Sequence, residues 1–430
     1  GGLRLGLEGL GTDEHPSTGA LRVVWSNQWE PTTTRQHASA VYAARFGSAG
    51  HTNCDIDALV SDPARFADVI AVRPDVLAAG FPCQDYSVAR PAGQSQGLVG
   101  KKGVLWWSIY SALEQLASHG TPVRYLVLEN VDRLLQSPAA EPGRDFRTIL
   151  LSLALLGYAV EWRVVNSSDY GFPQRRRRVF LVGYHCSTTM HARAAQAVDE
   201  RRLDWFTQDC VFAQALPVTA GASRCDSLDI GSDPVAASAP RPRLKCSPFQ
   251  NAGAMVGGRV ITAKVVADVP DCTRYVGRRV PMTLGDVVRG TGDVPAGYFI
   301  DDSSLDRWTY LKGPKTLDRV SASGHSYVYS EGAVAFPDPL SRPSRTVITG
   351  EGGASPSRTK HAIRTADGKL RRLTPEELEQ LNGFPRGWTR HHGVTDARRA
   401  FMMGNALVVG IVRAIGEALA ANATCEAGSR

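Results

Sequence analysis

Short apolar runs alternate with helix-like stretches over the first 185 residues, and this alternation constrains the fold more than any other feature of the chain. Four runs are rich in Val or Leu and end at polar residues or a Gly, as buried strands do: LRVVWS (21–26), DVLAAG (75–80), YLVLEN (125–130) and RRVFLVG (177–183). Three stretches between them have helical composition: residues 37–47, 103–120 and 145–158. This order predicts an α/β fold in which helices cover both faces of a parallel sheet.

The pattern changes after residue 185. Residues 186–342 are punctuated by Pro, Gly, Ser and Asp, which predicts a smaller, loop-rich domain. A helix is expected to begin at Thr374, because Pro375 suits the first helical position and Glu377 completes a capping box. Residues 406–423 predict a last amphipathic helix. We therefore expect three parts, residues 1–185, 186–342 and 343–430.

Composition narrows the class of protein. With 430 residues, 21% charged and 43% hydrophobic, the chain is expected to be globular, with two or three domains. Its longest nearly apolar run, residues 149–160, is shorter than the ~20 residues of a membrane span, and the N-terminus does not resemble a signal peptide. The eight cysteines form no CxxC pair and no zinc-like spacing, so we expect no metal site, no disulfide framework and a cytoplasmic location.

Reactive side chains stand where the expected strands end, which is where open α/β sheets bind ligands. The run 75–80 leads into Phe81, Pro82 and Cys83, and the run 125–130 places Glu129 and Asn130 where its apolar part stops. A lone Cys is more often a buried structural thiol, but Cys83 follows a strand and precedes a long polar loop that resembles a mobile lid. Glu129 ends an apolar run, so a partly desolvated carboxyl there could hold and donate a proton.

The run Gln174-Arg175-Arg176-Arg177-Arg178 precedes the apolar residues VFLVG, which makes it the entrance to a strand. A solvated basic run is the simpler interpretation. Because strand side chains alternate between faces, Gln174, Arg176 and Arg178 should share one face, with Arg175 and Arg177 on the other.

Five motifs in order, FPCQ, ENV, QRRRR, LNGFP and GNALV, resemble the cytosine-C5 DNA methyltransferase family of bacterial or phage type. The resemblance covers residues 1–185 and about 343–423. It implies a Rossmann-like class I methyltransferase sheet, with residues 186–342 as a target-recognition domain inserted before the C-terminal helices.

The resemblance also implies a mechanism. Cys83 matches the nucleophile that adds to C6 of a flipped-out cytosine, and Glu129 matches the acid at N3 and the exocyclic amino group. Arg176 matches the arginine that holds the cytosine O2, with Arg178 as its supporting neighbour. The methyl group comes from S-adenosyl-L-methionine, and no metal is implied.

The residues that match the family's cofactor site are spread along the chain. Those expected to bind S-adenosylmethionine are Gly1, Gly2, Gln28, Trp29, Asp55, Ile56, Pro82, Gln84, Leu105, Asn405 and Ala406. Two departures stand out. A strand and a Phe-x-Gly turn are expected before Gly1 in the intact protein, and Gln28 stands where relatives commonly have an acid for the ribose hydroxyls. Gln28 therefore predicts a lower cofactor affinity.

The resemblance implies double-stranded DNA as partner, a monomer, a cognate restriction endonuclease in the same system, and a nucleoid-associated bacterial enzyme. We expect DNA contacts from Gln84, Ser87, Arg345, Arg371 and Arg372. Residues 343–372 carry seven basic and two acidic residues, which favours a phosphate-contacting hinge.

Two other functions compete. A tRNA cytosine-C5 methyltransferase shares the PCQ and ENV motifs, but the 157-residue insert favours duplex DNA, whose base edges must be read in the grooves. A catalytically inactive DNA-binding relative is disfavoured because Cys83, Glu129 and Arg176 are all present.

Overall fold

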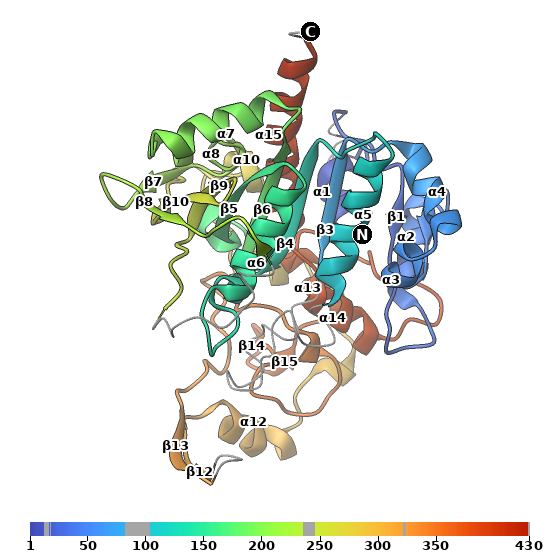
Figure 1. Cartoon of the computed structure of the whole chain (residues 1–430). Helices are drawn as coiled ribbons and strands as arrows, with labels where there is room; N and C mark the ends of the chain where they lie inside the picture. Colours follow the sequence, from blue (N-terminus) through green and yellow to red (C-terminus); the bar gives the residue numbers. More distant parts are fainter. Residues whose placement is uncertain (13–16, 18, 82–103, 235–245, 321–323, 429–430) are drawn as a thin grey trace.

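A mixed seven-stranded sheet forms the centre of the molecule (Figure 1). The computed structural model describes residues 1–12, 17, 19–81, 104–234, 246–320 and 324–428. In spatial order the strands are β3 (Val76–Gly80), β4 (Tyr125–Val131), β6 (Arg177–His185), β5 (Tyr158–Asn166), β9 (Ala252–Val256), β10 (Arg259–Ala263) and β8 (Asp226–Asp229). β3 and β4 pair in parallel, whereas β4 with β6 and the further pairs out to β8 are antiparallel. The expected parallel sheet is thus wrong beyond β4.

Helices cover both faces of this sheet, as the sequence predicts. One face packs against α1 (Gly2–Glu8), α7 (Thr189–Asp199), α8 (Val211–Ala215) and α15 (Val409–Gly428). The other packs against α3 (Ile56–Val60), α4 (Pro63–Val72), α5 (Val104–Ser118) and α6 (Arg144–Leu155). Alternate residues of β4 enter the two cores, with Tyr125 and Val127 in the first and Leu126 and Leu128 in the second. This two-sided burial explains why the strand is almost wholly apolar.

The expected strand over residues 21–26 is largely wrong. Strand structure is confined there to β1 (Ser26–Asn27), which pairs in parallel with β2 (His51–Thr52) in a small separate sheet. Val24 is 44% exposed, so this run is not buried on both sides as a central strand would be. The helix expected next to it forms as α2 (His37–Phe46).

Strands of the loop-rich region extend the central sheet past residue 185. β8, β9 and β10 belong to residues 186–342 and are hydrogen-bonded in series beyond β5. Shorter elements of this region are β7 (Val218–Ala220), β11 (Val265–Ala267), α10 (Thr273–Val276) and α11 (Leu284–Arg289). The division of the chain at residue 185 stays a prediction, but the sheet does not end there.

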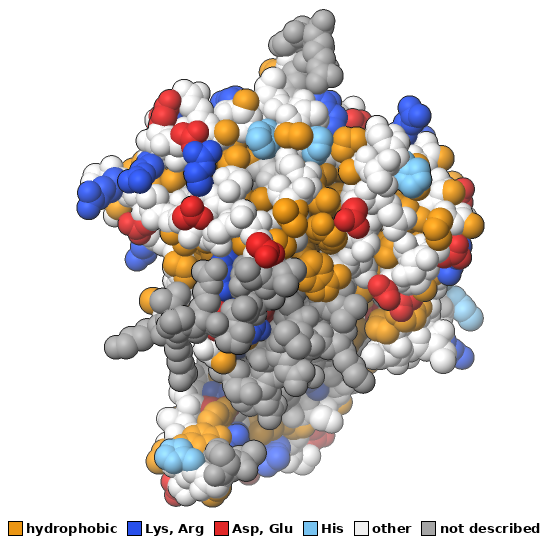
Figure 2. Space-filling model, in the orientation of Figure 1, with side chains coloured by type: hydrophobic (Ala, Val, Ile, Leu, Met, Phe, Trp, Pro, Cys, Tyr) orange, Lys and Arg blue, Asp and Glu red, His pale blue; other side chains and the backbone are white. Residues whose placement is uncertain are grey.

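The lower lobe in Figure 1 consists of α12 (Leu305–Lys312) and a hairpin of β12 (Lys315–Val320) and β13 (Ser326–Glu331). Figure 2 shows apolar side chains on the surface of this lobe, and Val320 and Val328 are 67% and 63% exposed. The hairpin therefore packs little of its surface against the rest of the described chain.

The C-terminal segment has a core of its own. The segment contains β14 (Ala362–Arg364), β15 (Leu370–Arg372), α13 (Pro375–Leu381) and α14 (Asp396–Asn405). Leu5 of α1 packs into its core. The capping box expected at Thr374 is confirmed, because Thr374 and Glu377 exchange side-chain and backbone hydrogen bonds. The expected last helix is confirmed as α15, which begins three residues later and ends five residues later than predicted.

Candidate functional site

Glu129 and Arg178 lie side by side at one end of the sheet. Glu129 is on β4 and Arg178 is the second residue of the neighbouring antiparallel β6, so their side chains meet diagonally across the two strands. Arg178 Nε lies 3.0 Å from Glu129 Oε1, and the two side chains are 17% and 15% exposed. A partly buried pair of this kind presents an acid and a guanidinium donor next to each other.

The end of β3 lies against the same carboxylate. Gly80 is the parallel partner of Glu129, and a Cβ at Gly80 would lie 3.3 Å from Glu129 Oε2. Phe81 follows and is buried against Trp106, with ring centroids 5.6 Å apart. Pro82, Cys83, Gln84 and Ser87 lie outside the described residues. Gly80, two residues before Pro82, lies beside Glu129.

Asn130 is a buried neighbour of the pair, and the sequence placed it at the strand end without predicting a role for it. Its side chain is 1% exposed, its Oδ1 accepts from the backbone N–H of Val131, and its Nδ2 has no hydrogen-bond partner within the described part of the chain. The ENV motif, which contains Asn130, is the sequence signal that points to this residue.

Arg176 lies elsewhere, although the predicted alternation of faces is confirmed. Gln174 and Arg176 are buried and Arg178 is partly buried, whereas Arg175 and Arg177 are exposed. Arg176 donates to the backbone oxygens of Val347 and Gly404, each at 2.9 Å, and is 2% exposed. This placement does not support its expected contact with the cytosine O2.

The small β1–β2 sheet brings part of the expected cofactor site together. Gln28 donates its backbone N–H to Thr52, and Asn27 bonds the backbone of Cys54 through both ends of its side chain. Trp29 and Asp55 follow these paired residues directly. The indole of Trp29 is 36% exposed, and Asp55 caps α3, which begins at Ile56. An exposed indole, a half-buried Ile and a carboxylate oxygen suit a purine that carries an amino group.

Of the other expected cofactor residues, those that the structure describes lie on or next to three helices. Gly1 and Gly2 begin α1, and a Cβ on Gly2 would lie 3.1 Å from Leu407, next to Asn405 and Ala406 at the end of α14. Leu105 is half-buried in the first turn of α5, the helix whose Ser108 donates to Asp57 of α3 at 3.4 Å. The fold thus brings Gly2 close to Leu407, the residue after Ala406, and brings α5 close to α3.

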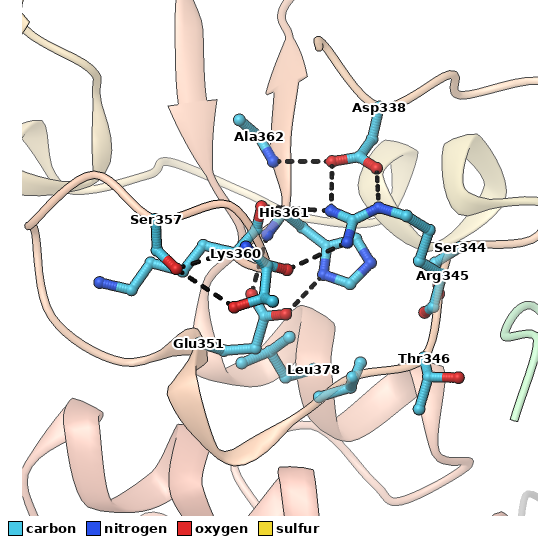
Figure 3. A network of polar contacts seen from close by, with 12 residues as sticks. Asp338, Ser344, Arg345, Thr346, Glu351, Ser357, Lys360, His361, Ala362 and Leu378 are labelled. Atoms are coloured by element: carbon cyan, nitrogen blue, oxygen red, sulfur yellow. Dashed lines mark hydrogen bonds and ion pairs between the residues drawn. The ribbon is translucent and has the colours of Figure 1, made fainter. Parts of the chain in front are cut away.

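The three arginines expected to contact DNA have partners inside the molecule. Arg371 forms two hydrogen bonds with the buried Glu377, at 2.6 and 2.8 Å. Arg345 pairs with Asp338 through two nitrogens (Figure 3), and Arg372 donates to Gly297 and Gly353. The structure therefore gives these three side chains internal partners, and their expected contacts with DNA stay a prediction.

The same network carries other charges of the expected hinge. His361 is fully buried and bonds Glu351 through Nδ1 at 2.7 Å, as Figure 3 shows. Lys360 donates to the backbone oxygens of Gly353 and Ser355. Most of the basic excess of residues 343–372 thus joins chain segments to one another.

Two adjoining cavities, of about 340 and 530 Å³, lie between residues 291–298 and the C-terminal segment. Both are lined by Pro295, Tyr298 and Asp396, and neither is lined by β3, β4 or β6. Arg372 lines the smaller cavity. These volumes therefore do not mark the pair formed by Glu129 and Arg178.

The described ranges contain neither a clear metal site nor a disulfide. No group of three or more His, Cys, Asp and Glu there could hold a metal ion, and the seven cysteines in these ranges are free thiols. Within the same ranges, no single helix has the length and apolarity to cross a membrane, although the bent pair of α14 and α15 meets both criteria.

Known proteins resemble this chain in sequence and in fold. The C-5 cytosine-specific DNA methylase family matches residues 1–209 and 296–421. The type II methyltransferase M.Sau3AI of Staphylococcus aureus is 40% identical over 419 residues, which cover 97% of this chain and 92% of that protein. The type II methyltransferase M.NgoBI of Neisseria gonorrhoeae is 35% identical over 184 residues, 43% of this chain and 47% of that protein.

Solved structures share the fold at low sequence identity. The Entamoeba histolytica methyltransferase EhMeth superimposes with a TM-score of 0.55 at 11% identity, covering 97% of this chain and 94% of its own. The S. pombe Dnmt2 methyltransferase gives 0.51 at 13% identity, covering 97% and 96%. The predicted methyltransferase fold is thereby confirmed, and the sequence match over most of its length shows that the chain belongs to the C-5 cytosine-specific DNA methylase family.

Proposed function

We propose that this DNA cytosine-C5 methyltransferase uses Cys83 as nucleophile and the pair of Glu129 and Arg178 to hold the target base. The observation that supports this proposal is the 3.0 Å contact between Arg178 and Glu129 beside the end of β3. N3 and O2 are adjacent on one edge of cytosine. A carboxyl group and a guanidinium that lie side by side can therefore bind both atoms of a flipped-out base.

The proposed reaction begins with the Cys83 thiolate. It adds to C6 while the protonated Glu129 transfers its proton to N3, which converts the C5–C6 double bond into an enamine with a nucleophilic C5. C5 would then bond the electrophilic methyl group that S-adenosylmethionine supplies when bound, with S-adenosylhomocysteine as the leaving group. A base then removes the C5 proton, the thiolate leaves C6, the double bond re-forms and the N3 proton returns to Glu129.

We further propose that residues on both sides of the β1–β2 sheet hold the adenosine part of S-adenosylmethionine. Trp29 would stack on the adenine, and Asp55 would accept from its amino group through the oxygen that does not cap α3. Gly1, Gly2, Asn405 and Ala406 would close the site, together with Ile56, Leu105, Pro82 and Gln84. Gln28 would bind the ribose hydroxyls without charge assistance.

M.Sau3AI is named a type II methyltransferase, and this chain matches it over most of its length. We therefore propose that the chain methylates one specific sequence in double-stranded DNA, as a monomer in the bacterial cytoplasm, alongside a cognate restriction endonuclease. Bisulfite sequencing of DNA from cells that express the intact protein would identify the methylated sequence.

Labelled S-adenosylmethionine with either duplex DNA or tRNA tests the proposal. We expect label in DNA, complete loss of transfer in Cys83→Ala, and unchanged DNA binding by that variant. Cys186→Ala is the matched control, because Cys186 is an exposed thiol at the end of β6 and should be dispensable. Label in tRNA alone, or methylation by Cys83→Ala, would contradict the proposal.

A further inference from the structure

Three distant segments of the chain meet at the entrance to β6. Gln174 Oε1 accepts from the backbone N–H of Val347 at 2.9 Å, and Arg176 donates to the backbone oxygen of the same residue. Gln174 Nε2 also donates to Leu381 and to Asn382 Oδ1, both at 3.0 Å. Side chains just before β6, a strand of the central sheet, therefore bond both polar groups of the Val347 backbone.

The third segment is the end of α14. The last carbonyls of a helix lack partners within the helix and carry partial negative charge. Here Arg176 donates to Gly404 at 2.9 Å, and Asn382 Nδ2 donates to Met403 at 3.2 Å. A buried cation at this position suits the helix dipole as well as the hydrogen bonds.

Backbone packing leaves little freedom at this junction. A Cβ on Gly404 would lie 2.2 Å from the backbone N of Thr349 and 2.3 Å from the carbonyl carbon of Ile348. The end of α14 therefore rests directly on the backbone of residues 348–349. Asn405 and Ala406, the residues proposed to close the cofactor site, follow immediately.

We propose that Arg176 is a positioning residue. It holds the end of α14 and Val347 against the entrance to β6, and it thereby positions Asn405 and Ala406 at the cofactor site. The inference rests on the proposed cofactor site. It assigns Arg176 to the cofactor side of the reaction, whereas the sequence motif assigned it to the cytosine. Arg178, two residues along the same face, remains with the base.

The test compares Arg176→Met and Arg176→Lys with the wild type. Calorimetry without DNA measures the affinity for S-adenosylmethionine, and steady-state kinetics separate KM for S-adenosylmethionine from kcat. We expect Arg176→Met to weaken S-adenosylmethionine binding at least tenfold and to raise its KM in proportion, with DNA affinity within twofold of the wild type. Arg176→Lys should restore part of the loss, because an ammonium can bond one of the two carbonyls.

Arg175→Met is the matched control. Arg175 is exposed, and the hydrogen bonds recorded for it involve its backbone, so its replacement should leave all three quantities unchanged. Hydrogen exchange adds a readout that needs no ligand, because amides of residues 346–350 and 403–408 should exchange faster in Arg176→Met. If that variant does not fold, Arg176→Lys carries the same comparison.

Unchanged S-adenosylmethionine affinity in Arg176→Met, with a loss confined to kcat or to DNA binding, would overturn the inference and return Arg176 to the cytosine. Failure of the proposed function would look different. A wild type that binds S-adenosylmethionine without methylating DNA would refute the function, while the effect of Arg176→Met on cofactor affinity would still decide the positioning role.

Discussion

Arg177 and Arg178 are consecutive residues that meet carboxylates in opposite surroundings. Arg178 pairs with Glu129 where both side chains are less than one-fifth exposed, whereas Arg177 pairs with Asp132 where the side chains are 61% and 31% exposed. The two arginines share β6, and both pairs join a guanidinium to a carboxylate. They differ in solvation, which determines how much an ion pair contributes.

This difference gives a prediction at the residue scale. Glu129→Gln keeps the shape of the side chain but cannot protonate N3, so kcat should fall by about 10²–10⁴-fold, the usual contribution of general acid catalysis. The KM for S-adenosylmethionine should not change. Steady-state kinetics measure both quantities. Asp132→Asn is the control and should retain wild-type kcat; equal losses in the two variants would mean that the Glu129 pair has no special role.

Arg371 gives a second prediction of this kind. Its partner Glu377 is fully buried and also accepts from Thr374 and Thr291. Arg371→Met leaves that carboxylate without its cation and should lower the free energy of unfolding by about 3–5 kcal/mol. Urea denaturation measures this loss, and Arg364→Met, which changes an exposed arginine of β14, is the control.

The alternative for Arg371 is the phosphate contact expected from the sequence. It predicts no loss of stability and a flatter dependence of DNA affinity on salt concentration. That combined result would contradict the structural role. The sequence could show that residues 343–372 are basic, but it could not show their partners, because Glu377 and Asp338 reach Arg371 and Arg345 through folds of the chain that have no local pattern.

At the scale of elements, strands with uniform apolar composition were predictable and a strand with buried charges was not. β3, β4 and β6 coincide closely with predicted runs, whereas β5 was missed. β5 contains Glu161 and Arg163, each 1% exposed. Their partners are the hydroxyl of Tyr184 and the backbone oxygens of Phe206 and Leu216, which lie on other elements. Burial also raises the pKa of Glu161, which a sequence pattern cannot reveal.

The contact of α14 with residues 348–349 gives a prediction at this scale. Gly404→Ala places a methyl group where the backbone of Thr349 lies, so helix and loop must separate. We expect a loss of about 1–3 kcal/mol in stability and weaker binding of S-adenosylmethionine, because Asn405 and Ala406 move with the helix end. Denaturation and calorimetry measure the two effects.

Gly292→Ala is the control for that change, since a Cβ on Gly292 meets no atom within 4 Å. A Gly404→Ala variant as stable as the Gly292→Ala variant would show that α14 and residues 348–349 can move apart at little cost in free energy. The GNALV motif predicted a cofactor role for this region, but the requirement for Gly404 itself depends on a loop more than fifty residues earlier in the chain.

At the scale of the whole molecule, several basic side chains of the chain join one part of the molecule to another. The lower lobe is attached to the C-terminal segment through Arg358, which donates to the backbone oxygens of Leu311, Gly313 and Gly332, and through Lys312, which donates to Lys360. The sequence predicted a phosphate-contacting hinge from the charges of residues 343–372, which include Arg358. Burial was the missing information, because a charge count does not distinguish a solvated cation from one that joins two lobes.

Lys312 makes the stability of the whole molecule depend on pH. Burial, with a smaller contribution from nearby Arg345, lowers the pKa of Lys312 from 10.5 to about 8. Between these values the unfolded chain binds a proton that the folded chain does not, so stability rises with pH. Lys312→Met removes this titration. The wild type should therefore gain about 2 kcal/mol relative to Lys312→Met between pH 7.5 and pH 9.5, measured by urea denaturation at both values.

Lys369→Met is the control, since the side chain of Lys369 is 69% exposed beside Asp367 and its replacement should leave the pH dependence unchanged. A constant difference between wild type and Lys312→Met across this range would mean that Lys312 keeps an ordinary pKa at the junction. A decrease with pH would mean that the junction stabilises the charged ammonium, in which case Lys360 and Trp308 would outweigh the cost of burial.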